Sequence, residues 1–396
     1  MFVSTYPPRH CGIATFTQAL SSATGEREIV ALHASGPNLL YPSEVHHRIR
    51  LDEPGDYART ARDLARCADV VSIQQEHTIW GGDDGAAVLD FVHALDAPAV
   101  ATLHTVLRHP TPNQRAVLLE LIRAAAATVV MSRSAAHVLT RTYGVAAAAI
   151  DVIPHGVPNL PLVDAETIKP ALELAGREVI LGFGLIGPGK GYELVIDALP
   201  AVVAARPTAC FVIVGVTHPD TLRVEGETYR RSLEERVARL GMGKYVRFID
   251  RFVGRVELTR LLEGADVFVT PYTNLDQTVS GTLSYAMGAG RAIVSTPFAH
   301  AAELLDGGRG MLAPPGSPGA WADAVIGLLE NDELRAALGR RAHEHSRAMV
   351  WSSVAGRYRE LFARVAAGAR ATAAARVAVR STGPRASQTS AIVDGR

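Results

Sequence analysis

The sequence predicts an α/β protein made of two doubly wound, Rossmann-like domains that face each other across a cleft. Short apolar runs of strand length alternate with longer segments of helical periodicity along most of the chain. The alternation pauses over Pro154–Pro170, a stretch that contains four prolines. The chain has 396 residues, 48% of them hydrophobic, which is enough for two domains with complete cores.

The first half contains six apolar runs that have the length of buried strands, with amphipathic segments between them. Strands are expected over 2–5, 29–32, 70–74, 99–103, 127–131 and 149–153. Helices are expected over 15–23, 57–67, 85–94, 113–124 and 135–143. Because strands that alternate with helices form parallel sheets, ligands are expected at the carboxyl ends of these strands.

The second half repeats the pattern without repeating the sequence. Strands are expected over 179–183, 210–214, 246–249, 267–270 and 292–295. Helices are expected over 192–205, 229–240, 256–265, 282–289, 318–330, 332–346 and 351–364. We therefore predict an N-terminal domain (1–158), a linker (159–176), a C-terminal domain (177–348), a helix (349–367) that packs back on the N-terminal domain, and a disordered tail (368–396) rich in Ala, Arg, Ser and Thr.

Composition and missing motifs argue against several classes of function. The 40 Lys and Arg residues balance 40 Asp and Glu residues, so no net field attracts nucleic acid. The three cysteines are scattered, and we find no secretion signal and no membrane-length apolar run, which together favour a cytoplasmic protein. The motifs DxD, HExxH and GxSxG do not occur in the sequence, which disfavours metal-dependent transferases and two classes of hydrolase.

The most informative segment is the glycine-rich loop FGLIGPGKG, residues 183–191, between a predicted strand and a predicted helix. Glycines let backbone N–H groups approach a phosphate closely, and Lys190 adds a cation. No Ser or Thr follows Lys190, so the loop is not the P-loop of nucleotidases. An ordinary turn without a ligand is an equally good interpretation of this loop alone.

Other polar residues follow predicted strands and are expected at the same edges. Gly12 opens the first helix, His104 ends the strand 99–103, and Glu76 and His77 follow the strand 70–74. Each residue also has a purely structural interpretation. Gly12 would belong to an ordinary turn, His104 would be a structural histidine, and Glu76 would cap a helix. Ser280 is an expected N-cap, and the helix start that it caps offers N–H groups and a positive dipole end to the cleft.

Taken together, the motifs resemble the GT-B glycosyltransferases, and within them the retaining enzymes of family 4, mannosyltransferase-like branch. The matching segments are STYPPRHCGIATFT (4–17), QQEHTIWGG (74–82), ATLHTVL (101–107), VIPHGVP (152–158), GPGKG (187–191), ADVFVTPY (265–272), DQTVSGTLSYAMGAGRAIVSTP (276–297) and GRG (308–310). The resemblance implies a nucleotide-sugar donor held by the C-terminal domain and a saccharide or glycan acceptor held by the N-terminal domain.

The resemblance also implies roles for individual residues. Lys190 matches the lysine at the donor diphosphate, and His104 matches the histidine at the transferred sugar; these two are the expected catalytic residues. The expected donor-binding residues are Gly12, Lys190, Gln277, Thr278, Ser280, Gly281, Thr282 and Tyr285. Glu76 and His77 are the expected acceptor residues. Neither a metal nor a cofactor is expected, GDP-mannose is the first donor to consider, and a lipid-linked acceptor would bring the protein to a membrane surface.

Three positions depart from the family pattern. Leu185 stands where the family has an arginine, and Gln277 and Tyr285 replace two glutamates, the second of which binds the donor ribose. Losing one charge-assisted contact costs about 1.5–3 kcal/mol, which weakens donor binding without abolishing it. Arg251, Thr278 and Ser280 are expected to compensate. The departures keep two alternatives open: a weakly active sugar- or nucleotide-binding subunit of another transferase, and a GT-B sugar phosphorylase or epimerase.

Overall fold

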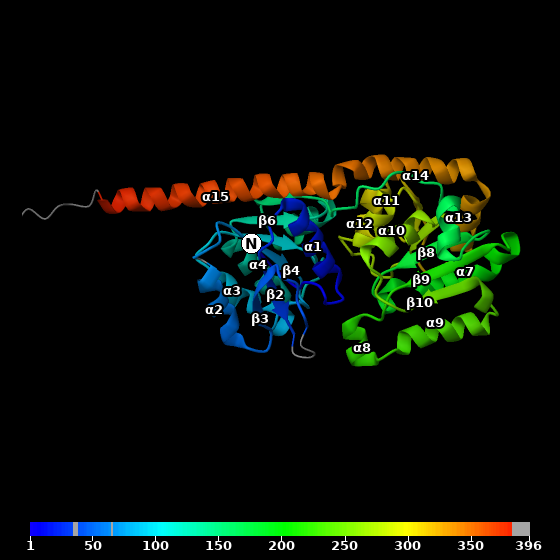
Figure 1. Ribbon diagram of the computed structural model, residues 1–396, viewed down its shortest axis with the longest axis horizontal. Helices are drawn as coiled ribbons and strands as arrows, with labels where there is room; N and C mark the ends of the chain where they lie inside the picture. The colour runs from blue at the N-terminus through cyan, green and yellow to red at the C-terminus, as the bar shows by residue number, and fades with distance from the viewer. Residues whose placement is uncertain (35–38, 65, 382–396) are drawn as a thin grey trace, which may run out of the picture.

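The computed structural model describes residues 1–34, 39–64 and 66–381, which form two α/β halves side by side (Figure 1). The N-terminal half is built on an all-parallel seven-stranded sheet in the order β3-β2-β1-β4-β5-β6-β7. Its strands are β1 (Phe2–Ser4), β2 (Ile29–His33), β3 (Val45–Arg50), β4 (Val71–Gln75), β5 (Ala99–Leu103), β6 (Ala127–Val130) and β7 (Ile150–Val152).

Helices cover both faces of this sheet. The N-terminal helices are α1 (Gly12–Thr24), α2 (Pro54–Leu64), α3 (Ala87–His93), α4 (Pro112–Ala124) and α5 (Arg133–Val138), with short turns η1 (Asp83–Gly85), η2 (Leu139–Tyr143) and η3 (Ala147–Ala149). One core cluster joins one face of the sheet to α2, α3, α4 and α5. A second joins the other face to α1 and the C-terminal helix α15.

The C-terminal half has an all-parallel six-stranded sheet in the order β10-β9-β8-β11-β12-β13. Its strands are β8 (Glu178–Phe183), β9 (Ala209–Val214), β10 (Val246–Ile249), β11 (Val267–Thr270), β12 (Ala292–Ser295) and β13 (Met311–Leu312). The main helices are α6 (Ala165–Ile168), α7 (Tyr192–Ala205), α8 (Pro219–Glu225), α9 (Thr228–Arg239), α10 (Arg255–Glu263), α11 (Gly281–Gly288), α12 (Ala299–Leu305), α13 (Pro318–Glu330) and α14 (Asp332–Ser346). The short turns are η4 (Lys169–Leu172), η5 (Pro188–Lys190), η6 (Gly243–Tyr245) and η7 (Arg347–Met349).

The two doubly wound sheets confirm the predicted fold class, and several elements differ from expectation. The prediction missed β3 and β13, and it missed the short helices α6, α8 and α12. Strand β3, VHHRIR, is a largely exposed edge strand, so it carries polar residues in place of an apolar run. Strand β13 has only two residues, too few to show a period.

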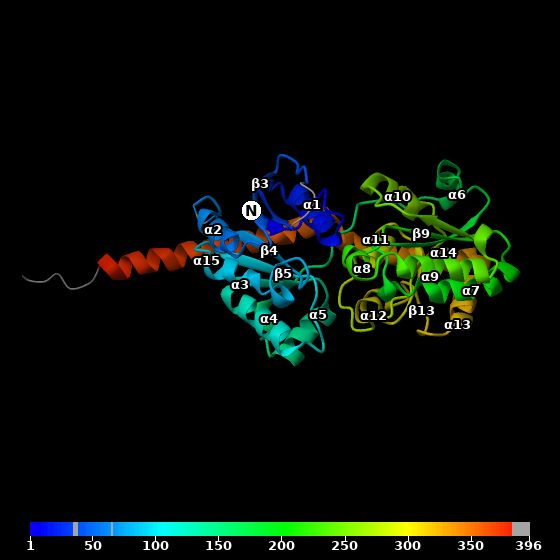
Figure 2. The ribbon, with the colours of Figure 1, turned by 90° about the horizontal axis from the view of Figure 1, so that it is seen from below.

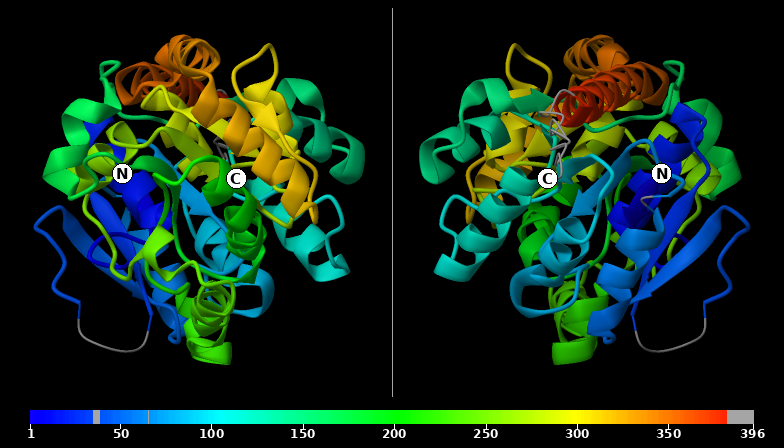
Figure 3. Two further views of the ribbon diagram at one scale, coloured as in Figure 1. Left: turned by 90° about the vertical axis from the view of Figure 1, so that its right-hand side faces the viewer. Right: turned by 90° about the vertical axis from the view of Figure 1, so that its left-hand side faces the viewer.

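The chain returns to the N-terminal half through α15 (Trp351–Ser381), as predicted. Val157, where the chain leaves the N-terminal half, lies beside Trp351, where the chain returns to it. The Trp351 backbone N–H donates to the Val157 carbonyl at 3.0 Å. Helix α15 then packs on α1, and Thr102 Oγ1 and Tyr358 Oη share a buried hydrogen bond of 3.1 Å. Figures 1 and 3 show α14 and α15, in orange and red, lying across one side of the molecule.

The prediction that the chain is disordered from residue 368 onward is wrong for residues 368–381. Helix α15 continues to Ser381 and projects past the N-terminal sheet in Figures 1 and 2, while residues 382–396 lie outside the described residues. The segment is rich in alanine, which has the highest helix propensity, so it forms a helix although it lacks an apolar period. No helix among the described residues is long and apolar enough to cross a membrane.

The carboxyl ends of the two sheets face each other. Segments that follow β1, β5 and β6 contact segments that follow β10, β11 and β12. The contacts are His10 stacked on Phe252, Arg108 paired with Asp276 at 3.1 Å, and the Arg133 and Ser134 N–H groups bound to the Glu303 carboxylate at 2.9 and 2.8 Å. The edge at which ligands bind in doubly wound sheets is therefore shared by both halves.

Candidate functional site

The glycine-rich loop leaves β8 and returns through η5 to the start of α7. Gly191 has a positive φ of 64°, and a Cβ there would lie 2.0 Å from the Pro271 carbonyl oxygen, so no other residue fits this position. Gly184 has φ of 137°, and a Cβ there would lie 3.5 Å from Lys190 Nζ. The glycines thus bring the loop against the segment after β11 and place the ammonium group of Lys190 beside the loop backbone.

Lys190 begins a chain of polar contacts that leads to the start of α11. Its Nζ donates to Tyr272 Oη at 3.2 Å and lies 4.3 Å from the centre of the Tyr272 ring. Tyr272 Oη shares a 2.6 Å hydrogen bond with Thr282 Oγ1, which lies 3.1 Å from Ser280 Oγ. Burial opposes ionisation of Tyr272, but Lys190 and the two hydroxyls outweigh it and lower the Tyr272 pKa. The predicted residues Lys190, Ser280 and Thr282 therefore form one network.

Tyr272 was not singled out from the sequence, although it ends the motif ADVFVTPY. It follows β11 by two residues, at the same edge as the other candidates. It is 1% exposed and stacks on Phe298 at 5.1 Å, so its ring is fixed while its hydroxyl faces Lys190. Position after a strand was the signal that could have identified it.

The first turn of α11 is occupied by protein groups. Ser280 Oγ caps the helix by accepting from the Leu283 N–H at 3.3 Å, as predicted. The Ser280 N–H donates to His300 Nδ1 at 2.8 Å. A Cβ on Gly281 would lie 2.7 Å from His155 Nε2, so the imidazole of His155 rests directly on this backbone. The N–H groups of Gly281 and Thr282 are those that this helix start can still offer to a ligand.

His104 lies at the carboxyl end of β5, where the sequence predicts it. Its Nε2 is 2.8 Å from Gln74 Oε1, and because that oxygen only accepts, Nε2 carries the proton and Nδ1 is left as an acceptor. Burial, with a smaller contribution from His155, lowers the His104 pKa to about 3. His104 is therefore neutral at pH 7, suited to orient a sugar hydroxyl and unsuited to act as a cationic acid.

Phe16 of α1 connects His104 to the start of α11. Its ring lies 4.9 Å from His104 and 5.1 Å from His155, both edge to face. Burial lowers the pKa of His155 to about 4, and burial with a contribution from His155 lowers that of His300 to about 3. Three neutral histidines thus lie at the junction between the halves, His155 and His300 buried and His104 partly buried. Of these three, only His104 was expected from the sequence to have a role.

The predicted acceptor residues lie beside His104. Glu76 accepts from the hydroxyl of Thr105, the residue after His104, and from the His77 N–H at 3.0 Å. Burial is the largest influence on Glu76 and raises its pKa. His77 Nδ1 lies 3.3 Å from the Asp84 carbonyl oxygen, and its buried Nε2 has no partner among the described residues. A role in acceptor binding remains a prediction for both.

Gly12 begins α1, where the sequence expects a turn open to the cleft. It is exposed, and no atom of the described residues beyond its chain neighbours would lie within 4 Å of a Cβ there. The N-cap residue Cys11 makes no side-chain hydrogen bond to the described first turn. The N–H groups of this first turn are therefore available to an anion.

The other predicted donor residues are less directly placed. Gln277 Nε2 donates to the Val279 carbonyl at 2.8 Å, and Thr278 is buried. Tyr285 packs on His155 with ring centres 5.9 Å apart, and burial raises its pKa. The ring of Tyr285 thus packs against the domain junction; donor binding by these three residues remains a prediction.

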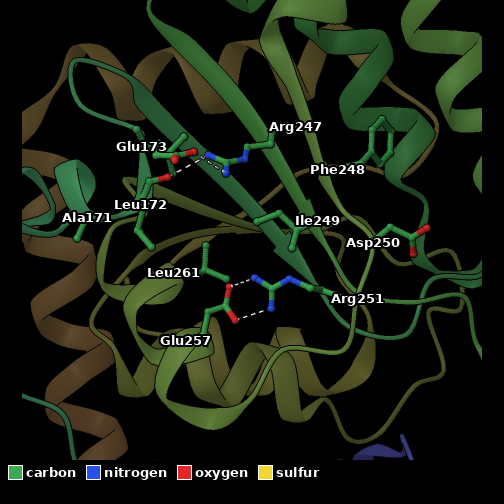
Figure 4. A pocket seen from close by; sticks show the side chains of 11 residues that line it. Ala171, Leu172, Glu173, Arg247, Phe248, Ile249, Asp250, Arg251, Glu257 and Leu261 are labelled. Atoms are coloured by element: carbon green, nitrogen blue, oxygen red, sulfur yellow. Dashed lines mark hydrogen bonds and ion pairs between the residues drawn. The ribbon is translucent and has the colours of Figure 1, made fainter.

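Arg251 does not behave as expected. Its guanidinium is bound by both carboxylate oxygens of Glu257, in a hollow of about 440 Å³ between η4, β10 and α10 (Figure 4). On another side of the hollow, Arg247 donates to the Leu172 carbonyl at 3.0 Å and to Glu173 at 3.3 Å. Because Arg251 is already paired with Glu257, this contact gives no support to its compensating for Leu185.

No group of three or more His, Cys, Asp or Glu among the described residues is arranged to hold a metal ion.

Two family models match the chain, one in each half. The model for glycosyltransferase family 4 covers residues 12–159, and the model for glycosyl transferases group 1 covers residues 177–331. Together they cover every described strand except β1, and all of the predicted site residues from Gly12 to Tyr285.

Curated relatives match over part of their length. A phosphatidyl-myo-inositol mannosyltransferase of Mycolicibacterium smegmatis is 28% identical over 277 residues, covering 68% of this chain and 66% of the relative. A D-inositol 3-phosphate glycosyltransferase of Corynebacterium glutamicum is 29% identical over 221 residues, covering 51% of this chain and 50% of the relative. The chain thus spans between half and two thirds of the length of these two relatives.

Solved structures show the same fold at low identity. Anabaena HepE in complex with UDP matches with a TM-score of 0.72 at 17% identity, covering 92% of this chain and 99% of that one. A sucrose-phosphate synthase from Thermosynechococcus elongatus matches with a TM-score of 0.71 at 16% identity, covering 93% and 99%.

Proposed function

Because the chain belongs to family 4 of the GT-B glycosyltransferases, we propose that it transfers a hexose from a nucleotide-sugar donor to a saccharide or glycan acceptor. The observation that carries the proposal is the network of Lys190, Tyr272, Thr282 and Ser280, which joins a glycine-rich loop to a helix start at the edge facing His104. One cation and two helix starts at a shared edge suit a diphosphate.

In this proposal the donor diphosphate is the leaving group. Lys190 and free backbone N–H groups at the starts of α1 and α11 stabilise the charge that develops on it. His104, neutral and fixed by Gln74, orients the sugar through a hydroxyl. The acceptor hydroxyl attacks from the same face, and the departing phosphate oxygen takes its proton, so the sugar configuration is retained. Closure of the halves excludes water.

We propose mannose as the transferred sugar, with GDP-mannose the first donor to test. A curated relative named as a phosphatidyl-myo-inositol mannosyltransferase supports this choice. The structural neighbour Anabaena HepE was solved in complex with UDP, so uridine and guanine nucleotides must both be tested. The same relative's name supports a lipid-linked acceptor, which would bring the protein to a membrane surface; a free saccharide or glycan is the other acceptor class to test.

The test compares two lysines. Lys190→Ala should lower transfer from the best donor by about two to three orders of magnitude, as for loss of a preorganised charge at a leaving group. Lys244→Ala removes an exposed lysine next to the start of β10 and should leave transfer unchanged. The assay follows release of GDP, UDP or ADP from their sugars, with and without acceptor. Near-normal transfer by the Lys190 variant would refute the proposed role of this site.

A second candidate is a binding subunit that assists another transferase. Its support is Tyr285, which puts an aromatic ring against His155 where the family has a carboxylate. Stabilisation by nucleotides without hydrolysis or transfer from any donor would favour this candidate over the first.

A further inference from the structure

The loop between β1 and α1 crosses the cleft. The His10 ring stacks on Phe252, with ring centres 4.5 Å apart and planes inclined by only 2°. Phe252 follows β10, whose last residue accepts from the Gly215 N–H at 3.0 Å, and a Cβ on Gly215 would meet the Gly184 carbonyl oxygen at 1.9 Å. The loops after β8, β9 and β10 are thus packed together, and the N-terminal loop is docked on them.

Arg9 is next to His10 in this loop and has unused hydrogen-bonding capacity. Its Nη1 is buried, and no described residue accepts a hydrogen bond from it. Because a buried guanidinium N–H without an acceptor is costly, such a group needs a ligand or a water molecule to accept its hydrogen bond.

The Arg9 charge acts on Tyr41 of its own half and also on His218 of the C-terminal half. The backbone N–H of His218 donates to the Ile186 carbonyl at 2.7 Å. The His218 Cβ lies 3.9 Å from the position that a Cβ on Gly187 would take, so His218 packs on the glycine-rich loop. Burial is the main cause of its lowered pKa; Asp220 opposes the shift, and the charges of Lys190 and Arg9 add to it. One cation from each half therefore acts on the same imidazole.

We propose that Arg9 is the second cation of the diphosphate site, reaching from the N-terminal half to the loop in which Leu185 stands without an arginine. This rests on the proposed function, since the anion is the diphosphate of the sugar nucleotide. Lys190 and Arg9 then bind it from different halves of the molecule. The ligand itself links the two halves, so donor binding favours the closed arrangement.

The test measures binding of inorganic pyrophosphate, GDP and UDP by isothermal titration calorimetry. Arg9→Gln should weaken pyrophosphate and the better nucleotide by about 10- to 150-fold, the effect of losing a charge-assisted contact. Arg9→Lys should recover part of the loss, because it restores the charge without the planar fork. Arg27→Gln removes the same charge from an exposed position two residues before β2 and should bind like wild type.

The outcomes separate this proposal from the proposed function. Wild-type pyrophosphate binding by Arg9→Gln, with binding lost in Lys190→Gln, would overturn the role of Arg9 and leave the function standing. The proposal would also be overturned if Arg9→Gln bound diphosphates like wild type and raised only the KM for a phosphorylated acceptor. Arg9 would then contact a phosphoryl group of the acceptor. If diphosphates bind with the predicted Arg9 dependence but no sugar is transferred, the site stands and the transferase function fails.

Discussion

Two helices begin at the cleft, α1 in the N-terminal half and α11 in the C-terminal half, and their first turns differ in how much space they leave. At α1, Gly12 is exposed and no described atom beyond its chain neighbours would approach a Cβ within 4 Å. At α11, Ser280 caps the turn, His300 takes the Ser280 N–H and His155 lies against Gly281. Both turns look alike in sequence, a small polar or sulfur-containing residue followed by glycine.

The difference separates two uses of a helix N-terminus. The open turn of α1 has N–H groups that only a ligand or water can satisfy, so it suits transient binding of an anion. The filled turn of α11 uses protein groups to fix the position of Thr282 and hence of Tyr272 and Lys190. We infer that α1 contributes mainly to donor affinity and α11 mainly to the rigidity of the site.

The largest expected effect on stability at neutral pH comes from adding one methyl group at each start. Gly281→Ala should destabilise the protein by about 1–3 kcal/mol, because the methyl group would overlap His155 Nε2. Gly12→Ala should change stability by no more than about 0.5 kcal/mol, since the space is open, but should raise the KM for the donor if phosphates approach there. Urea unfolding and steady-state kinetics measure both; equal destabilisation by the two variants would contradict the distinction.

The difference between the two starts was not predictable from sequence, although most of the fold was. Strands such as Val267–Thr270 and Ala292–Ser295 match their predicted limits because each is a largely apolar run bounded by polar or turn residues. The edge strand β3 and the alanine-rich end of α15 lack the apolar pattern on which such predictions depend.

The candidate site was predictable to the extent that its residues follow strands. His104 and Lys190 were identified in this way, and Ser280 by its capping chemistry. The contacts that give these residues their properties are long-range, such as Lys190 with Tyr272 and Ser280 with His300. No local pattern shows which distant residue a packed side chain will contact, so His155, His300 and Arg9 were not assigned roles. Tyr272 was missed although it follows a strand.

The filled start should also make stability depend on pH. His300 has a folded pKa of about 3, below its unfolded value of about 6.5, so the unfolded chain takes up the proton first. Its contribution is complete above about pH 6.5 and is lost as the pH falls toward 3, by about 1.4 kcal/mol per pH unit. His300→Asn keeps an acceptor near the position of Nδ1 but removes the titration.

Urea unfolding at pH 7.5, 6.5, 5.5 and 4.5 should therefore show a shallower loss of stability in His300→Asn than in wild type, by about one proton. His47→Asn changes an exposed histidine of the edge strand β3 and serves as the control. An unchanged slope in His300→Asn would mean that His300 does not stay neutral in the folded protein.

The smallest expected effect concerns a third helix start at the cleft, that of α5, which the other half of the molecule fills. Both carboxylate oxygens of Glu303 accept from the first N–H groups of α5, so this contact exists only while the halves are closed. Glu303→Ala should weaken closure by about 0.5–1 kcal/mol, the value of a charge at a partly exposed helix N-terminus. The expected signs are a larger radius of gyration in X-ray scattering and a modestly raised KM for the donor.

Glu330→Ala removes an exposed glutamate at the end of α13 and should change neither measurement. If saturating donor restores the wild-type radius in Glu303→Ala, the ligand and the Glu303 contact act on the same closure; if the radius of the variant never differs from wild type, the contact does not hold the halves together.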